Sequence, residues 1–188
     1  MKIVNLMSQQ AEAEILSLMQ NPLTKDQGFL LLMNTYQKPL YWHIRRLVVT
    51  HEDAEDLLQE TFILVYSHIA SFKGDSRLYT WLYRIATNEC NRHFRRKESR
   101  IQREELLTDQ TAELAVEPEL ENSDDILVKF QKAIQQLPNK QKIVFNLRYY
   151  EELPYEDIAQ ILHTTVGTLR TSYHFAFEKI KNYLSEHD

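Results

Sequence analysis

A chain of 188 residues with 43% hydrophobic and 26% charged residues is not disordered throughout, and it is long enough for one ordinary domain or two small ones. Three glycines and five prolines leave little material for hairpins and favour an almost entirely helical protein. The single cysteine, Cys90, excludes a disulfide framework and a cysteine zinc cluster. The first ten residues do not form a secretory signal and the apolar run at 29–33 is too short for a membrane span, so we expect a cytoplasmic protein with no membrane insertion.

Charge is distributed unevenly along the chain. Ten acids and two arginines give residues 98–125 a net charge of −8, so the rest of the chain carries +3 and the total is −5. This segment contains Pro118 and has no sustained apolar stripe, and we interpret it as a linker with a short helix near 103–114. Ser123 or Asp124 is a suitable cap for the helix that follows.

The spacing of apolar residues, proline and glycine predicts an all-α protein made of two small helical domains joined by this acidic linker. The predicted divisions are an amino-terminal extension with no assigned position (1–24), a three-helix domain (25–100), the linker (101–125) and a four-helix domain with a helix-turn-helix (126–188). The predicted helices are 25–49, 52–70 and 78–100 in the first domain, and 126–136, 139–151, 155–162 and 166–184 in the second.

The helix at 52–70 carries acids around an apolar residue. Asp53, Asp56 and Glu60 share a face, as a carboxylate metal site requires, but no second helix offers matching ligands with a histidine. The polar arc of this helix consists of Glu52, Asp56, Gln59, Glu60 and Ile63. Acids around an apolar centre suit a docking surface for a basic helix of another protein. A lone exposed isoleucine is the alternative interpretation.

The helix at 78–100 combines aromatic and basic residues. Its predicted apolar face holds Leu82, Ile85, Ala86, Cys90 and His93. A second face gathers Trp81, Arg84, Asn88, Asn91, Arg92 and Arg95, and the preceding loop offers Phe72, Lys73, Ser76 and Arg77. Because arginine binds phosphates, asparagine reads base edges and an aromatic ring stacks on an unpaired base, we expect a nucleic-acid surface with a loop that holds an extruded base. The alternative is a solvated basic face with Trp81 half buried.

The last two predicted helices have the form of a helix-turn-helix, with a tight polar connection between them. Thr164 or Thr165 is expected to cap the second helix. The predicted inner face of that helix is Leu169, Tyr173, Ala176, Phe177 and Ile180. Its predicted outer face is Thr168, Thr171, Ser172 and Phe175, flanked by Arg170 and His174. An outward aromatic ring such as Phe175 suits packing on a thymine methyl group in the major groove.

Three segments, in this order and spacing, resemble the extracytoplasmic-function sigma factors of bacteria. AEDLLQETF (54–62) resembles the polymerase-binding helix of that family, and FKGDSRLYTWLYRIATN (72–88) resembles its promoter-melting segment. LPNKQKIVFNLRYYEELPYEDIAQIL (137–162) with GTLRTSYHFA (167–176) resembles its carboxy-terminal domain. The resemblance covers residues 27–100 and 126–184, which is most of the chain.

The resemblance implies a transcription initiation factor that binds core RNA polymerase and promoter DNA, catalyses nothing and needs no cofactor or metal. It assigns binding of the clamp coiled coil in the largest polymerase subunit to Asp56, Gln59, Glu60 and Ile63, and a contact with the polymerase flap to the carboxy-terminal domain. It assigns recognition and melting of the minus-ten element to Phe72, Lys73, Ser76, Arg77, Trp81, Arg84, Asn88 and Arg92. It assigns the minus-thirty-five element to Thr165, Thr168, Arg170, Thr171, His174 and Phe175.

Two features of the sequence qualify this expectation. Ser172 and Phe175 stand where arginine is frequent in the family, so weaker phosphate contacts and altered base preference are expected there. The acidic linker corresponds to the connector that passes through the polymerase in this family. Members of the family commonly bind an anti-sigma factor, so such a partner is expected here. The rival interpretations are a stand-alone helix-turn-helix regulator that binds duplex DNA without polymerase, and a helical carboxylate metalloenzyme.

Overall fold

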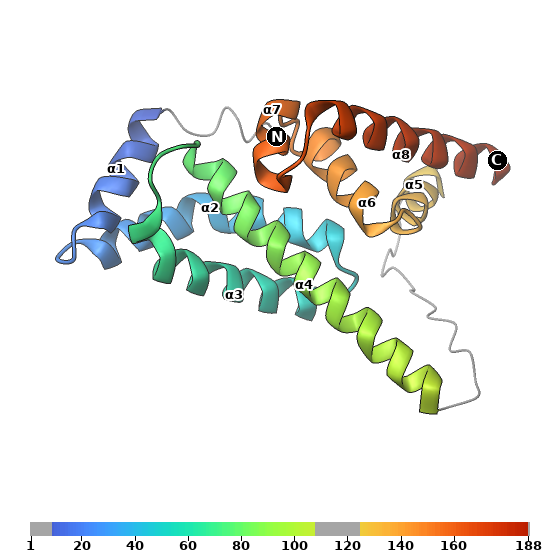
Figure 1. The fold of residues 1–188 in the computed structure, drawn as a ribbon, viewed down its shortest axis with the longest axis horizontal. Helices are drawn as coiled ribbons and strands as arrows, with labels where there is room; N and C mark the ends of the chain where they lie inside the picture. Colours follow the sequence, from blue (N-terminus) through green and yellow to red (C-terminus); the bar gives the residue numbers. More distant parts are fainter. Residues whose placement is uncertain (1–8, 108–124, 188) are drawn as a thin grey trace.

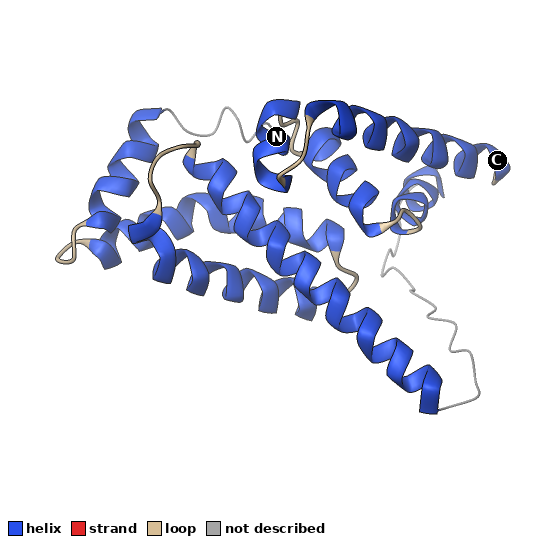
Figure 2. Ribbon diagram, viewed as in Figure 1, coloured by secondary structure: helices blue, strands red, loops and turns tan. Residues whose placement is uncertain are grey.

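The computed structural model describes residues 9–107 and 125–187, and within these ranges the fold is entirely helical (Figures 1 and 2). The first unit contains α1 (Gln9–Gln20), α2 (Lys25–Leu47), α3 (His51–His68), the 3₁₀ turn η2 (Ile69–Ser71) and α4 (Leu78–Leu107). The second contains α5 (Asp125–Gln135), α6 (Asn139–Phe145), the π-helical turn η3 (Asn146–Tyr150), α7 (Tyr155–Leu162) and α8 (Val166–Glu186). The helices predicted from the sequence are therefore confirmed to within a few residues, apart from α1 and the longer α4. Of the helix expected near 103–114, residues 103–107 continue α4 and the remainder lies outside the described residues.

Local sequence features explain where these elements begin and end. The side chain of Thr50 accepts a hydrogen bond from Asp53 N at 3.1 Å and caps α3. Between η2 and α4 the chain forms the 72–77 loop, in which Gly74 has a φ of +78°, a left-handed conformation that other residues rarely adopt. Pro154 precedes α7, and His163 ends α7 in the left-handed conformation. Thr165 caps α8 by accepting a hydrogen bond from Thr168 N at 3.2 Å, as one of the two predicted caps.

The two helical units lie against each other rather than apart. One cluster of buried apolar side chains runs from the first unit, with Leu47, Tyr83 and Ala86, into the second, with Leu147 and Ile158. The contacts are made mainly by α4 with α7 and by α2 with η3, and Figure 1 shows α6, α7 and α8 arranged along one side of α2 and α4. The carboxy-terminal half of α4 extends beyond both units (Figure 1). We call this arrangement, with the two units packed together, the closed form. In it the two predicted DNA-binding surfaces are close neighbours.

Candidate polymerase and nucleic-acid interfaces

An aromatic groove lies between α2 and α3. It has a volume of about 530 Å³ and is lined by Phe29, Met33, Gln37, Leu58, Gln59, Phe62, Ile63, Tyr66 and Ser67. The ring of Phe29 makes edge-to-face contacts with Phe62 at 6.1 Å and with Tyr66 at 5.0 Å between ring centroids, so the wall of the groove is already packed. Ile63 is 65% exposed at this groove. The predicted docking residues Gln59 and Ile63 therefore border an apolar recess that the sequence did not reveal.

The acids predicted beside Ile63 differ in their surroundings. Asp56 is exposed, whereas Glu60 Oε2 lies 3.4 Å from Arg92 NH2 on α4. Arg92 also pairs with Glu89, whose burial raises the pKa of its carboxyl group. One residue predicted to bind polymerase and one predicted to bind DNA thus contact each other, and two carboxylates flank the guanidinium of Arg92.

The 72–77 loop and the first turns of α4 enclose a pocket of about 290 Å³, which we call the loop pocket. Its lining from the first unit is Ser71, Phe72, Lys73, Asp75, Ser76, Trp81 and Arg84. Five residues predicted to open or read the minus-ten element are therefore brought together around one cavity. Gln160 and His163, at the end of α7, line the same pocket, so the second unit covers it in the closed form.

Helical periodicity places Trp81 among the polar residues of its helix, and the structure shows that its side chain is more deeply buried than the half-buried alternative. Trp81 is only 7% exposed, and its ring packs on Phe72 with 5.4 Å between the centroids. The helical periodicity of α4 correctly separates its other faces, but it carries no information about a loop that folds back over the helix. The buried ring of Trp81 therefore lines the loop pocket from inside the protein.

Arg77 is held by a residue that sequence reasoning missed. Arg77 Nε donates to Glu12 Oε2 at 2.9 Å, and Arg77 NH2 donates to Glu12 Oε1 at 3.3 Å. Glu12 lies in α1, within the extension whose position was not predicted, and is only 5% exposed. No motif in the sequence pairs these two residues, which are 65 positions apart.

Of the two remaining predicted minus-ten residues, Asn88 lines a second cavity, of about 670 Å³, between α4 and the second unit, whereas Arg92 pairs with Glu60 and Glu89 and does not line it. Asn88, Asn91 and Arg95 line it from α4. Thr164, Thr168 and Ser172 line it from the helix-turn-helix. Residues expected to contact two separate DNA elements thus share one cavity in the closed form.

The outer face of α8 largely follows the sequence. Thr168, Arg170, Thr171 and His174 are exposed, and Phe175 is 54% exposed. The prediction that Phe177 belongs to the inner face is wrong, since it is 49% exposed. The buried stripe follows Leu169, Ala176 and Ile180, and Phe177, one position after Ala176, is turned about 100° away from it.

Polar contacts between the two units surround Glu151. Arg46 NH1 donates to Glu151 Oε1 at 2.9 Å and Tyr83 OH donates to Glu151 Oε2 at 3.2 Å. Burial raises the pKa of Glu151 to about 7, against the lowering effect of Arg46. Nearby, Asn146 Nδ2 donates to the carbonyl of His43 at 2.9 Å and to its Nδ1 at 3.2 Å. Burial lowers the pKa of His43 to about 3, so this imidazole is neutral and its Nδ1 accepts.

A further contact joins Tyr79 on α4 to Asp157 on α7, with the phenol donating to the carboxylate. The guanidinium of Arg46 also lies 4.4 Å from the ring centroid of Tyr150. We call the contacts of Arg46, Tyr83, Glu151, His43 and Asn146 the interdomain cluster. Sequence reasoning named none of these residues, because each pair is far apart along the chain.

Among the residues that the structure describes, no group of three or more histidine, cysteine, aspartate or glutamate side chains is arranged to hold a metal ion. In the same part of the chain, no helix has both the length and the apolar character needed to span a bilayer.

Known proteins are similar to this chain in both helical units. Residues 32–100 match the family model described as sigma-70 region 2, and residues 127–180 match sigma-70 region 4. The RNA polymerase sigma-H factor of Pseudomonas aeruginosa is 33% identical over 162 residues, which are 81% of this chain and 84% of that protein. The ECF RNA polymerase sigma-E factor of Haemophilus influenzae is 35% identical over 165 residues, or 82% and 86% of the two chains.

Among solved structures, the sigma factor RpoE from Bartonella quintana, crystallised in complex with the anti-sigma factor NepR, is similar with a TM-score of 0.69. It is 26% identical to this chain, and the match covers 84% of this chain and 96% of that one.

Two helical domains, the second with a helix-turn-helix, are the architecture of a DNA-binding transcription factor. The chain belongs to the sigma-70 family, in its extracytoplasmic-function group, and it directs RNA polymerase to promoters through regions 2 and 4. Region 2 (32–100) lies within the first unit, and region 4 (127–180) lies within the second.

Proposed function

We propose that the groove between α2 and α3 receives the clamp coiled coil of the largest polymerase subunit. Ile63 and the aromatic wall supply apolar area to bury, and Asp56 and Gln59 are exposed beside them. This combination of an apolar centre with a polar, acidic rim supports a helical partner that presents basic residues. The observation that carries the proposal is the position of Gln59 and Ile63 on the rim of the groove.

We propose that the loop pocket holds the base extruded from the upstream edge of the minus-ten element. The packed rings of Phe72 and Trp81 offer an aromatic wall, while Lys73 and Arg84 supply positive charge for the adjacent phosphates. Asn88 is exposed on α4, and its amide group supports a role in reading a base edge. Binding of the flipped base in a preformed pocket offsets the unstacking cost of a few kcal/mol, so no nucleotide hydrolysis is needed.

The outer face of α8 is proposed to read the minus-thirty-five element in the major groove. Thr168, Thr171 and His174 offer hydrogen-bonding groups, and the exposed ring of Phe175 suits contact with a thymine methyl group. Region 4 is also proposed to contact the polymerase flap. The linker, with Glu117, Glu119 and Glu121, is proposed to pass through the polymerase; these residues lie outside the described part of the chain.

Binding of both promoter elements requires the closed form to open. The two elements are about 25 base pairs apart, which corresponds to about 85 Å of duplex. In the closed form Asn88 of region 2 and Thr168 of region 4 line one cavity, and Gln160 and His163 cover the loop pocket. We infer that the closed form is the resting state, and that polymerase and promoter bind the form in which the units have separated.

The docking proposal is tested by the double variant Gln59→Ala/Glu60→Ala. We expect a lower affinity for core polymerase with unchanged circular dichroism, since Gln59 is exposed and Glu60 is only partly buried. The matched control is Gln10→Ala/Glu14→Ala, which removes the same two residue types from exposed positions of α1. Equal polymerase affinity of the two double variants, measured by fluorescence anisotropy, contradicts the docking assignment.

We also propose that an anti-sigma factor binds this chain, as the complex of the similar Bartonella quintana protein with NepR suggests. A partner of this kind competes with core polymerase for the chain. The test is a competition assay with candidate proteins from the same genome, in which release of labelled chain from polymerase is expected. A candidate that binds the chain together with polymerase is not such a partner.

A further inference from the structure

Helix α1 lies outside the part of the chain that matches sigma-70 region 2, yet it is firmly seated on the first unit. Ile15 and Met19 are fully or almost fully buried, and α1 packs along α2. Gly28 of α2 permits this close approach, because a Cβ atom there would lie 2.7 Å from the Met19 backbone nitrogen and 2.8 Å from Leu18 Cβ. These contacts therefore hold the helix against α2 and so position it relative to region 2.

The buried carboxylate of Glu12 projects from α1 to the junction between the 72–77 loop and α4. Beyond its two hydrogen bonds from Arg77, Glu12 Oε2 lies 3.4 Å from Leu78 N, and Tyr36 OH donates to Glu12 Oε1 at 3.4 Å. Leu78 is the first residue of α4, where backbone N–H groups have no partner within the helix. Glu12 therefore caps α4 from another helix, at the end where a negative charge is most favourable.

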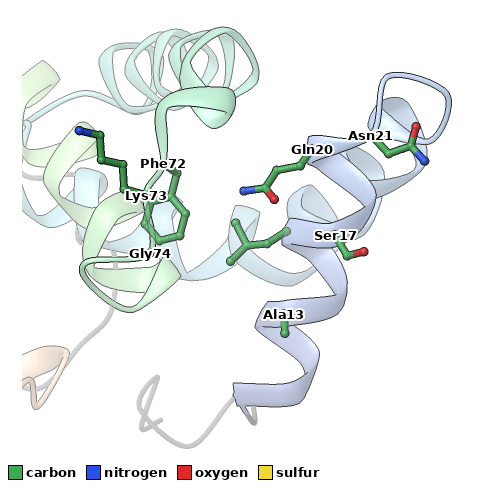
Figure 3. A pocket seen from close by; sticks show the side chains of 8 residues that line it. Ala13, Ser17, Gln20, Asn21, Phe72, Lys73 and Gly74 are labelled. Carbon is green, nitrogen blue, oxygen red and sulfur yellow. The ribbon is translucent and has the colours of Figure 1, made fainter.

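The tip of the 72–77 loop is not packed onto α1 in the same way. A cavity of about 520 Å³ separates them, lined by Ala13, Leu16, Ser17, Gln20 and Asn21 on one side and by Phe72, Lys73 and Gly74 on the other (Figure 3). The loop is thus tied at its junction with α4, while its tip has space to adjust. Phe72 and Lys73 line both this cavity and the loop pocket, so a movement of the loop changes the loop pocket directly.

We propose that α1 is a brace for strand opening and that Glu12 is its positioning residue. By holding Arg77 and the first N–H of α4, Glu12 fixes the end of the 72–77 loop and so keeps Phe72, Ser76 and Trp81 in the geometry that accepts an extruded base. Glu12 itself does not contact DNA, because it is buried. This inference rests on the proposed role of the loop pocket and adds to it the residue that preorganises the pocket.

If Glu12 acts as a brace, neutralising it should weaken DNA binding, whereas simple electrostatics predicts stronger binding. Removal of a negative charge near DNA strengthens binding to phosphates. Loss of the brace instead weakens the part of the affinity that depends on the extruded base. The two effects are separated by comparing a minus-ten strand that carries its base with the same strand made abasic at the extruded position.

The experiment uses polymerase reconstituted with the full chain, and oligonucleotides with the non-template minus-ten sequence of a promoter found by sequencing its transcripts. The wild type is expected to bind the intact strand more tightly than the abasic one. In Glu12→Gln this preference should fall by about tenfold, the size expected for loss of hydrogen bonds to a charged group. Glu14→Gln, an exposed position on the same helix, should leave the preference unchanged. Affinity for core polymerase should also be unchanged in Glu12→Gln.

A double-mutant comparison distinguishes loss of the Glu12–Arg77 contact from a general loss of folded protein. Arg77→Gln should reduce the preference for the intact strand as Glu12→Gln does, and the combined variant should show little further loss, because both remove one contact. A general loss of folded protein lowers binding of both strands equally and leaves the preference intact. An unchanged preference in Glu12→Gln, with a normal wild type, overturns the brace alone. A wild type that yields no transcripts, or that does not distinguish the two strands, overturns the proposed loop pocket and the brace with it.

Discussion

Substitution of Arg46 by alanine should open the closed form. Arg46 donates to the buried carboxylate of Glu151 and covers the ring of Tyr150, so its loss removes two contacts between regions 2 and 4. Removal of one partner from a buried ion pair costs about 3–5 kcal/mol. Because burial raises the pKa of Glu151 to about 7, this group takes up a proton near neutral pH and limits the cost. We therefore expect the lower end of the range, about 3 kcal/mol, or a shift of roughly 150-fold towards the open form.

Fluorescence energy transfer between labels on α3 and α8 measures this shift. Ser67 and Ser185 are exposed and can be replaced by cysteine, while Cys90 is fully buried and burial raises the pKa of its thiol, so it resists labelling. The efficiency of energy transfer should differ between Arg46→Ala and the wild type, because separation of the two units changes the distance between the labels. Arg45→Ala is the matched control, since Arg45 NH1 donates to the carbonyl of Val49 within its own unit. Equal energy transfer in Arg46→Ala and Arg45→Ala would refute the role assigned to the interdomain cluster.

Four further predictions concern pH, base reading and packing. In Glu151→Gln, the neutral, buried His43 remains the titrating group of the interdomain cluster. The closed form of this variant should therefore weaken as pH falls below 6.5, by up to about tenfold per pH unit. Energy transfer that stays constant between pH 7 and 5.5 argues against this. In the wild type Glu151 opposes this trend. Its pKa is raised from an ordinary value of 4.5 to about 7 in the closed form, so the closed form should weaken as pH rises through this range. Asn88→Ala should change base preference at the minus-ten element by about 1–3 kcal/mol, and an unaltered set of transcripts removes Asn88 from that role. Phe175→Ala should reduce the preference for thymine within the minus-thirty-five element, measured on a randomised promoter library, where equal selection by both proteins contradicts the contact. Gly28→Ala should cost about 1–3 kcal/mol in thermal unfolding through overpacking against α1, and should lower the preference for the intact minus-ten strand as Glu12→Gln does.

The sequence predicts those features that depend on local chemistry. Pro138 and Pro154 divide region 4 at the correct places, and Thr165 caps α8 as expected. The exposure of Ile63 and Phe175 also follows from helical periodicity, because each lies on a polar arc of its helix. Ile63 and Phe175 therefore lie on surfaces that the fold leaves exposed.

Features that depend on contacts between distant segments were not predictable from the pattern. Trp81 lies on a polar arc but is covered by Phe72 from the loop, and Glu12 has its partner in Arg77, far along the chain. The packing of region 4 on region 2 is another case, since Arg46 and Glu151 become neighbours only through the tertiary fold. Helical periodicity shows which side of a helix is apolar, but it does not show which other segment covers that side.

The most direct test of the account is transcription by core polymerase reconstituted with this chain. We predict that addition of the chain produces transcripts that begin at a discrete set of promoters, and that thymines of their minus-ten elements become reactive to permanganate. Polymerase without the chain should show neither. If the chain fails to bind core polymerase, or if the transcripts and permanganate pattern are the same with and without it, the central claim is contradicted.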